Sequence, residues 1–374
     1  MAVDITKLLQ LVVDKNASDL HLTVGVPPVV RIHGELKQLN LPPLTPDDTT
    51  TYMKSITPER YQQELKEKGG ADFGFAYENK ARFRTAIFMQ KGNIGLVLRR
   101  IPYKILAMED IGVPAMMKNY LMKPKGLILV TGPTGSGKTT TLASFIDFIN
   151  TEEASHIITI EDPIEYYFPH KRSIVNQREV GTDVPSFAEA LRRALRMDPD
   201  VILVGEMRDL ETMSAAITAA ETGHLVFGTL HTTGAAKTVN RIIDAYPVDQ
   251  QEQVRAQLAS ALLVVISQLL LPRADQEGVI AAFEIMVMVP AIEHLIRENE
   301  VHKIPSVIQT SGKLGMILLD DYLFNLYKQR KISYETLMEF AVHPDELQNK
   351  IKEQLGFEPT TIGGTERPKQ QIRK

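Results

Sequence analysis

With 374 residues, the chain is long enough to form two domains with buried cores. A formal net charge of −4 at pH 7, without a basic cluster, argues against a general nucleic-acid-binding protein, and the absence of Cys excludes disulfides and thiolate metal sites. The first 22 residues lack the basic start and continuous apolar core of a signal peptide. We therefore expect a cytoplasmic protein that associates with a membrane only through partners.

The first hundred residues predict a small α+β domain. Apolar residues at Ile5, Leu8, Leu9 and Val12 have helical spacing, and short strand-like segments follow at 20–24, 29–33, 81–90 and 94–99. The segment 101–116, with two prolines, predicts a linker into the next domain.

Several arginines of this domain are candidates for nucleotide chemistry. Arg82 and Arg84 alternate with Phe83, so both are expected on one face of a strand, and Arg99 follows in the next strand. Phosphoryl transfer benefits from a guanidinium group that reaches the γ-phosphate from a neighbouring module or subunit. Ordinary surface arginines in salt bridges explain any one of them equally well.

A glycine-rich segment follows the aliphatic run 126–130 and precedes a helical pattern. It reads GPTGSGKTT and comprises Gly132, Pro133, Thr134, Gly135, Ser136, Gly137, Lys138, Thr139 and Thr140. The glycines permit positive φ, so that main-chain N–H groups point at the oxygens of a polyphosphate. Lys138 adds a charge for the β- and γ-phosphates, and Thr139 a hydroxyl for Mg²⁺. The spacing and its context favour a nucleoside triphosphate site over a glycine-rich turn that binds nothing.

The rest of the region 117–290 alternates aliphatic runs with helical stretches. Further runs at 156–160, 201–204, 225–228 and 279–285 predict a parallel sheet covered on both faces, in a three-layer α/β domain. In such folds ligands bind at the carboxyl ends of the strands. We interpret the apolar stretch 258–271, which Ser and Gln interrupt, as a buried core helix too short to span a membrane.

Acidic residues and histidines follow these runs. Glu206, after 201–204, is the first candidate to orient the attacking water and to contact Mg²⁺ through water. Glu161, Asp162 and Glu165 follow 156–160, where Pro163 sets a turn, so we expect them at the same edge of the sheet. There they could hold metal-bound water or a partner's arginine, and a helix cap or solvated turn is the alternative. His231 is expected to leave its strand at the same edge and to sense the γ-phosphate. His224, at the start of that strand, fits a structural role better.

Beyond residue 290 the sequence predicts a helical region over 291–355. The tail 356–374 is rich in Pro, Gly, Thr and charge, so we expect it to be loosely ordered.

Four segments together resemble the signature boxes of the type II/IV secretion ATPase superfamily. They are GPTGSGKTTT, ITIEDPIEY, DPDVILVGEMRDLET and TGHLVFGTLHTTGA. Within the superfamily, ASDLHL, PPVVRIHGEL and AIEHLIREN make the chain similar to the type IV pilus retraction motors. Glu293 and His294 depart from the pattern of that last motif, where Arg and Asn are usual.

The resemblance implies a PAS-like N-terminal domain, a RecA-like ATPase core and a ring-shaped homohexamer. It also implies that hydrolysis of ATP with Mg²⁺ drives pilus disassembly and twitching motility against an inner-membrane platform protein. By matching motif, Lys138 and Thr139 bind phosphate and magnesium, and Glu206 is the catalytic glutamate. Glu161, Asp162 and Glu165 then form the acidic box, and His224 and His231 the histidine box. Arg82, Arg84 and Arg99 are arginine-finger candidates.

Three alternatives remain open on the sequence. An accessory retraction ATPase of the same systems shares all four boxes. A nucleotide-regulated assembly protein with little turnover is disfavoured by intact Glu206 and His231. A nucleic-acid translocase on the same core would show hydrolysis stimulated by DNA, with steep salt dependence. The missing four-cysteine zinc site favours retraction over extension motors.

Overall fold

The computed structural model describes residues 3–32, 34–78, 80–101 and 105–355. The predicted tail 356–374 lies outside these residues, as do positions 102–104 of the predicted linker. The chain forms two compact units, Met1–Leu127 with Thr139–Thr229 and Ile128–Lys138 with Leu230–Lys374. Within the described part of the chain, no helix is both long and apolar enough to cross a membrane.

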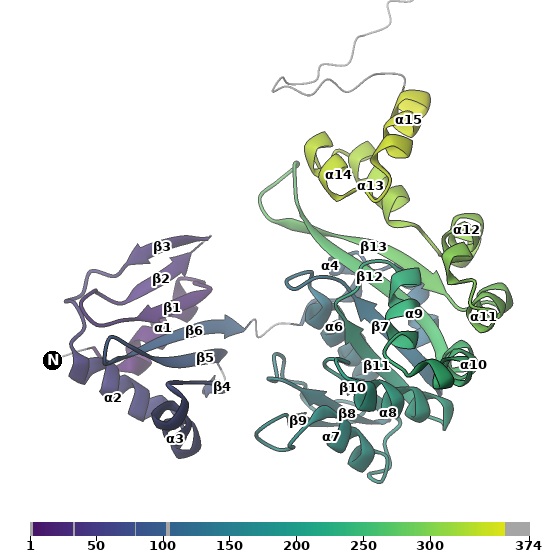
Figure 1. Ribbon diagram of the computed structural model, residues 1–374. Coiled ribbons are helices and arrows are strands. Elements are labelled where there is room, and N and C mark those ends of the chain that lie inside the picture. The colour runs from purple at the N-terminus through teal and green to yellow at the C-terminus, as the bar shows by residue number, and fades with distance from the viewer. Residues whose placement is uncertain (1–2, 33, 79, 102–104, 356–374) are drawn as a thin grey trace, which may run out of the picture. The chain divides into compact units, whose positions relative to one another are not determined.

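The N-terminal part contains a six-stranded antiparallel sheet in the order β3-β2-β1-β6-β5-β4 (Figure 1). Its strands are β1 (Asp19–Leu22), β2 (Val29–Ile32), β3 (Glu35–Gln38), β4 (Gly70–Tyr77), β5 (Ala81–Gln90) and β6 (Asn93–Ile101). The four predicted strands are confirmed, although His33 lies outside the described residues. The prediction missed β3, whose four residues are all exposed, and β4, which contains two glycines. Strand β3 has no apolar alternation, whereas β4 does alternate, with Ala71, Phe73, Phe75 and Tyr77 at every second position, and the prediction overlooked it.

Three helices pack against this sheet: α1 (Ile5–Asp14), α2 (Pro46–Ile56) and α3 (Glu59–Lys68). The predicted α1 begins after Asp4, whose carboxylate accepts a hydrogen bond from the N–H of Thr6 and so satisfies a free donor of the first turn. The apolar face of α1 packs with buried residues of the sheet, such as Leu20 and Phe83, in one core.

The second sheet has seven strands in the order β13-β12-β7-β11-β10-β8-β9. They are β7 (Gly126–Thr131), β8 (His156–Glu161), β9 (Ile174–Glu179), β10 (Val201–Val204), β11 (Leu225–Leu230), β12 (Leu262–Pro272) and β13 (Val279–Val287). Strand β10 is parallel to β8 and β11, β8 is parallel to β9, and β12 and β13 are antiparallel. The predicted α/β fold is therefore confirmed.

The helices of this region are α4 (Met108–Ile111), α5 (Lys118–Leu121), α6 (Lys138–Glu152), α7 (Phe187–Ala194), α8 (Leu210–Glu221), α9 (Ala235–Ile243) and α10 (Gln251–Ala261). The interpretation of 258–271 as one helix is wrong: α10 ends at Ala261 and β12 begins at Leu262. Since β12 is buried on both faces, its apolar residues carry no alternation that would distinguish a strand from a buried helix.

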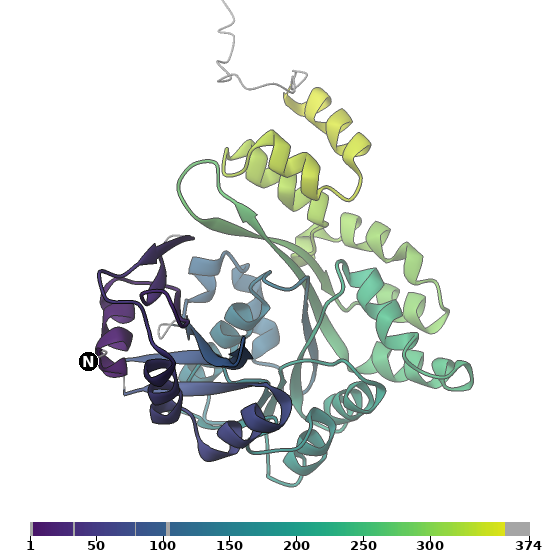
Figure 2. The same cartoon turned by 60° about the vertical axis from the view of Figure 1, so that its left-hand side comes forward.

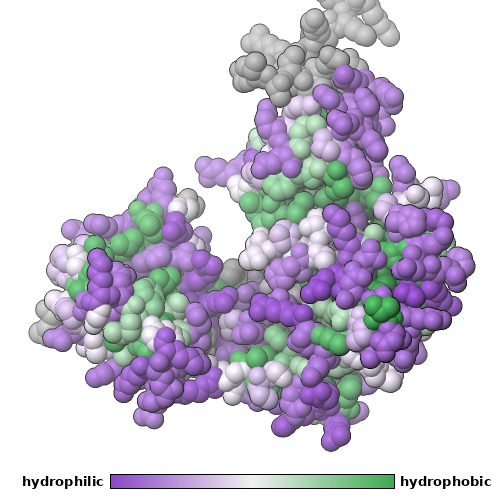
Figure 3. Space-filling model, viewed as in Figure 1, coloured by the Kyte–Doolittle hydropathy of each residue, from purple (hydrophilic) through white to green (hydrophobic). Residues whose placement is uncertain are grey.

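The predicted C-terminal helical region is confirmed over the residues described. It contains α11 (Pro290–Arg297), α12 (Ile304–Thr310), α13 (Leu319–Lys328), α14 (Tyr334–Phe340) and α15 (Pro344–Leu355). Figure 2 shows the long β12–β13 hairpin reaching these helices, and Leu271 of β12 shares a core with Leu323 and Ile351. On the face shown in Figure 3 the surface is mostly polar, with apolar side chains over the hairpin and the C-terminal helices.

Candidate functional site

The phosphate loop, which we define as Gly132–Gly137, connects the fully buried strand β7 to α6. Its three glycines have positive φ, 143° at Gly132, 81° at Gly135 and 86° at Gly137, as the sequence predicts. Lys138 Nζ donates hydrogen bonds to Gly132 O at 2.8 Å and to Pro133 O at 3.1 Å. The ammonium group therefore lies inside the curve of the loop, where it can exchange these carbonyl oxygens for those of a phosphate.

The side chain of Gln268, in β12, binds the main chain of the phosphate loop. Its Nε2 donates to Ser136 O at 2.8 Å, and the residue is 1% exposed. A Cβ atom at Gly132 would lie 2.2 Å from Gln268 O, and one at Gly137 would lie 2.9 Å from Gln268 Nε2. Packing against the main chain of β12 thus requires glycine at 132, whereas Gly137 is set by its positive φ and lies close to the Gln268 side chain. Sequence reasoning missed Gln268, which it interpreted as an interruption in a core helix.

The same unit anchors the loop that contains His231. His231 follows β11 directly and is exposed, as predicted. Three residues later, Gly234 N donates to Ser267 Oγ at 2.8 Å and Ala235 N to Glu284 Oε1 at 2.7 Å. Ser267 and Glu284 are paired across β12 and β13, so a single cross-strand pair holds the start of α9. Burial raises the pKa of Glu284, and hydrogen bonds from the main chain of Ala235 and Leu319 oppose this.

His224 lies at the other end of β11 from His231. The ring Nδ1 of His224 is 3.0 Å from Ala219 O, and its main-chain N–H donates to the same oxygen at 3.2 Å. At about 3.3 Å per residue, the six residues of β11 separate the two histidines by roughly 20 Å. The structure therefore does not bring them together, and it gives His224 a role in joining α8 to β11.

Glu206 follows β10 by two residues and lies at the carboxyl edge of the parallel strands. Val204 is paired with Ile160 of β8 and with Gly228 of β11, so these three strands end close to one another. Glu206 Oε1 lies 2.5 Å from Arg208 Nε, and the Glu206 side chain is 18% exposed. The main chain beside it is fixed, because Thr229 Oγ1 donates to Gly205 O at 2.6 Å.

The carboxylates of the acidic segment differ in their surroundings. Asp162 is exposed and Glu165 partly so, but Glu161 is 6% exposed. Glu161 Oε1 accepts from Thr159 Oγ1 at 2.6 Å and from Gln177 Nε2 at 3.1 Å. Burial raises the pKa of Glu161, and these hydrogen bonds lower it in part. The side chain of Glu161 therefore belongs to the interior, whereas Asp162 and Glu165 remain accessible.

Sequence reasoning missed β9, which organises the acidic loop, defined here as residues 162–168. Gln177 Nε2 also donates to Tyr166 O at 2.7 Å, and Gln177 Oε1 accepts from Phe168 N at 2.9 Å. Thr140, the last residue of the predicted nucleotide-binding segment, has its hydroxyl 3.0 Å from Tyr166 Oη, and Thr139 is partly exposed. The residues of β9 are mostly polar, so no hydrophobic pattern indicates the strand.

The three candidate arginines have different environments. Arg82 is buried, with Nη2 3.3 Å from Glu179 Oε2 and its guanidinium 4.2 Å from the ring centre of Tyr167. Arg84 is exposed, and it is paired across β5 and β6 with Arg99. Arg99 Nε donates to Asp19 Oδ1 at 2.9 Å.

Comparison with known proteins gives consistent matches over most of the chain. The family described as type II/IV secretion system protein matches residues 2–312. The Pseudomonas aeruginosa protein named type IV pilus retractation ATPase PilT is 48% identical over 343 residues, 92% of this chain and 99% of that protein. A Neisseria gonorrhoeae twitching motility protein is 46% identical over 308 residues, 82% of each chain.

A solved structure of the pilus retraction motor PilT with bound ADP has a TM-score of 0.88 and 49% identity, covering 93% of this chain and 100% of that one. Its fold fits the RecA-like core that the sequence predicts. The matched range includes the phosphate loop, Glu206 and His231. The chain belongs to the family of type II/IV secretion system proteins.

Proposed function

We propose that the chain is an ATPase that drives type IV pilus retraction. The observation that carries this proposal is the phosphate loop, in which three glycines with positive φ and the Lys138 ammonium form a site for a polyphosphate. The relatives named as pilus retraction proteins match over nearly the whole chain and support the same activity.

Several residues have the chemistry that ATP hydrolysis requires. The loop N–H groups and Lys138 hold the β- and γ-phosphates, the Thr139 hydroxyl is suited to bind Mg²⁺, and Glu206 would contact that ion through water. When bound, Mg²⁺ neutralises charge on these phosphates. Glu206 orients the attacking water and accepts its proton, and exposed His231 contacts the γ-phosphate.

The proposal includes an assembly. We infer a homohexamer that works in the cytoplasm against a platform protein of the inner membrane, as the resemblance implies. The domains would be 1–100, a linker at 101–116, a core at 117–290 and a helical region at 291–355.

Phosphate release by the purified full-length chain tests the activity. We expect MgATP-dependent turnover that is lost in Lys138→Ala and is not stimulated by single-stranded or duplex DNA. Turnover indistinguishable from that of Lys138→Ala would contradict the ATPase, and DNA stimulation would indicate a translocase.

Deleting the gene in the organism that carries it tests the biological role. Loss of a retraction motor leaves surface pili in place and abolishes twitching, whereas loss of an assembly motor removes the pili. Surface pili counted by electron microscopy therefore distinguish the two roles, and normal twitching would contradict both.

A further inference from the structure

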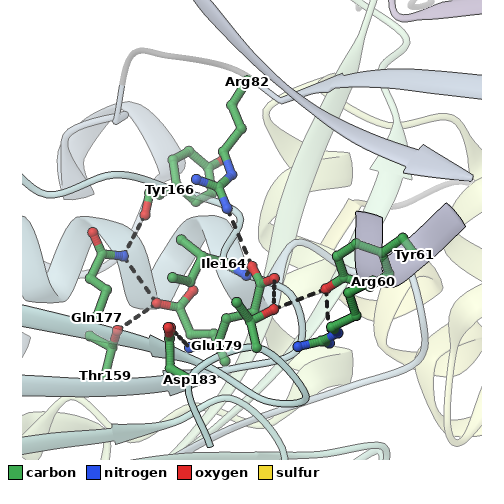
Figure 4. Close-up of polar contacts among 11 residues, drawn as sticks. Arg60, Tyr61, Arg82, Thr159, Ile164, Tyr166, Gln177, Glu179 and Asp183 are labelled. Atoms are coloured by element: carbon green, nitrogen blue, oxygen red, sulfur yellow. Dashed lines mark hydrogen bonds and ion pairs between the residues drawn. The ribbon is translucent and has the colours of Figure 1, made fainter. Parts of the chain in front are cut away.

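Glu179, the last residue of β9, lies at the centre of a buried group of polar contacts (Figure 4). Its Oε2 accepts from Ile164 N at 3.1 Å and from Arg82 Nη2 at 3.3 Å. Its Oε1 accepts from Thr182 Oγ1 at 3.0 Å. The side chains of Glu179 and Arg82 are each 10% exposed. One carboxylate thus joins the acidic loop, the turn after β9 and strand β5.

The N-terminal part of the chain supplies Arg82 and Tyr61 to this group, together with Arg60, whose Nη2 donates to Tyr61 Oη at 3.2 Å. Arg82 comes from β5, and its guanidinium also lies over the ring of Tyr167, which belongs to the acidic loop. Tyr61 comes from α3, and its hydroxyl is 2.9 Å from Thr182 Oγ1. Arg82 therefore contacts the acidic loop directly at Tyr167 and is linked to it a second time through Glu179.

Strand geometry explains why β9 holds the acidic loop. Side chains two residues apart lie on the same face of a strand, so Gln177 and Glu179 both face this loop. Gln177 binds Tyr166 O and Phe168 N near its end, and Glu179 binds Ile164 N near its start. The loop's position therefore depends on these two side chains.

Glu179 depends on Arg82 for charge compensation, because both side chains are nearly buried. A buried carboxylate that loses its cationic partner is strongly destabilised, so the Glu179 carboxylate is expected to turn toward water. This movement weakens its hydrogen bond from Ile164 N. Removing Arg82 is therefore expected to release the start of the acidic loop, although Arg82 has no direct main-chain contact there among the hydrogen bonds described.

We propose that Arg82 is a positioning residue that acts through Glu179 to fix the acidic loop from the N-terminal sheet of the same chain. This role differs from that of an arginine finger, which touches the nucleotide. Its consequence for catalysis rests on the proposed ATPase function, since the loop presents Asp162 and Glu165. Its structural part does not.

Amide hydrogen exchange of the full chain without nucleotide tests the structural part. Arg82→Gln and Glu179→Gln both remove the ion pair while keeping a polar side chain. We expect exchange in peptides covering 162–168 to rise about tenfold in each. Arg84→Gln is the matched control, because Arg84 is exposed on the same strand, and it should exchange at the wild-type rate.

The double variant sharpens this test. If Arg82 acts through Glu179, the double variant should exchange no faster than the faster single variant, because contacting residues are not additive. Multiplied effects, or wild-type exchange in Arg82→Gln, would overturn the proposal. Tyr61→Phe, which keeps the ring stacked 4.9 Å from Phe73, provides a milder change and should raise exchange about twofold near Thr182.

Steady-state hydrolysis tests the catalytic part. We expect both single variants to lower kcat about tenfold while KM for ATP changes less than twofold, because neither residue belongs to the phosphate loop. If Arg82 acted only as a finger, Glu179→Gln would keep the wild-type kcat. A wild-type chain without turnover would refute the proposed function, while the exchange measurements would still decide whether Arg82 positions the loop.

Discussion

The phosphate loop and the acidic loop are built in opposite ways. Lys138 closes the phosphate loop on carbonyl oxygens only five and six residues away, and its glycines set its curve. The acidic loop takes its position from Gln177, Glu179 and Arg82, the last of which is 97 residues from Glu179 in sequence. A locally determined loop is visible in a sequence motif, whereas a loop held by distant side chains is not.

The largest expected effect tests whether Glu206 or a carboxylate of the acidic loop is the general base. Glu206→Gln should slow ATP turnover by roughly two to four orders of magnitude, the scale for losing a positioned general base, and should leave ATP affinity unchanged. Single-turnover phosphate release measures the first, and calorimetric titration the second. Wild-type turnover would transfer the role to Asp162 or Glu165 of the acidic loop.

Nucleotide affinity should depend on the phosphate loop. Lys138→Ala removes a charged donor to the phosphates, so MgATP affinity should weaken roughly a hundredfold or more in calorimetric titration. Lys125→Ala is the matched control, because Lys125 is exposed just before β7 and contacts Glu221 O at 3.5 Å. Equal affinities in the two variants would contradict the assignment of the site.

A pair of glutamine variants compares the two loops directly. Gln268→Met removes the donor to Ser136 O, so we expect ADP affinity to fall about tenfold and the free energy of unfolding to fall by about 1–3 kcal/mol, the cost of a buried unsatisfied group. Gln177→Met removes two hydrogen bonds to the acidic loop and one to Glu161 but should leave ADP affinity unchanged. If Gln177→Met weakened ADP binding and Gln268→Met did not, the acidic loop rather than the phosphate loop would determine ADP affinity.

The smallest expected effect is a pH dependence of stability. The raised pKa of Glu284 means that the folded chain binds a proton more tightly than the unfolded chain, whose glutamate titrates near 4.5. The contribution of Glu284 to stability is therefore fully present below pH 4.5 and is lost as pH rises through the raised value. Glu284→Gln should flatten this part of the curve in urea unfolding at several pH values. If the pH dependence of the free energy of unfolding were the same in Glu284→Gln and in the wild type, Glu284 would not be its source.

How far the fold could be predicted depended on where each strand is buried. Strand β10 matches its predicted range because a short aliphatic run ends at Gly205. Strand β9 has no such run, since its accessible edge position tolerates Asn, Gln and Arg. Strand β12 has an apolar run but no alternation, so its sequence fits a buried helix as well as a strand.

The candidate site likewise has residues that local spacing predicts and residues that it does not. The phosphate loop, the placement of Glu206 after β10 and that of His231 after β11 follow from local spacing, and the structure places these residues as predicted. The supporting side chains Gln268, Ser267 and Glu284 carry no local signal, because their partners lie tens of residues away. The burial of Glu161 also carries no local signal, and one of its hydrogen-bond partners, Gln177, lies 16 residues away.

The adjacent positions of Ser267 and Gln268 have a consequence for folding. Ser267 accepts a hydrogen bond from Gly234 N and Gln268 donates one to Ser136 O, so a single dipeptide holds both the phosphate loop and the segment before α9. Slippage of β12 against β13 by one residue would turn both side chains to the wrong faces and separate Ser267 from Glu284. A chain with a misaligned hairpin would keep its motif intact and yet have no binding site, so correct alignment of the hairpin must precede competence to bind nucleotide.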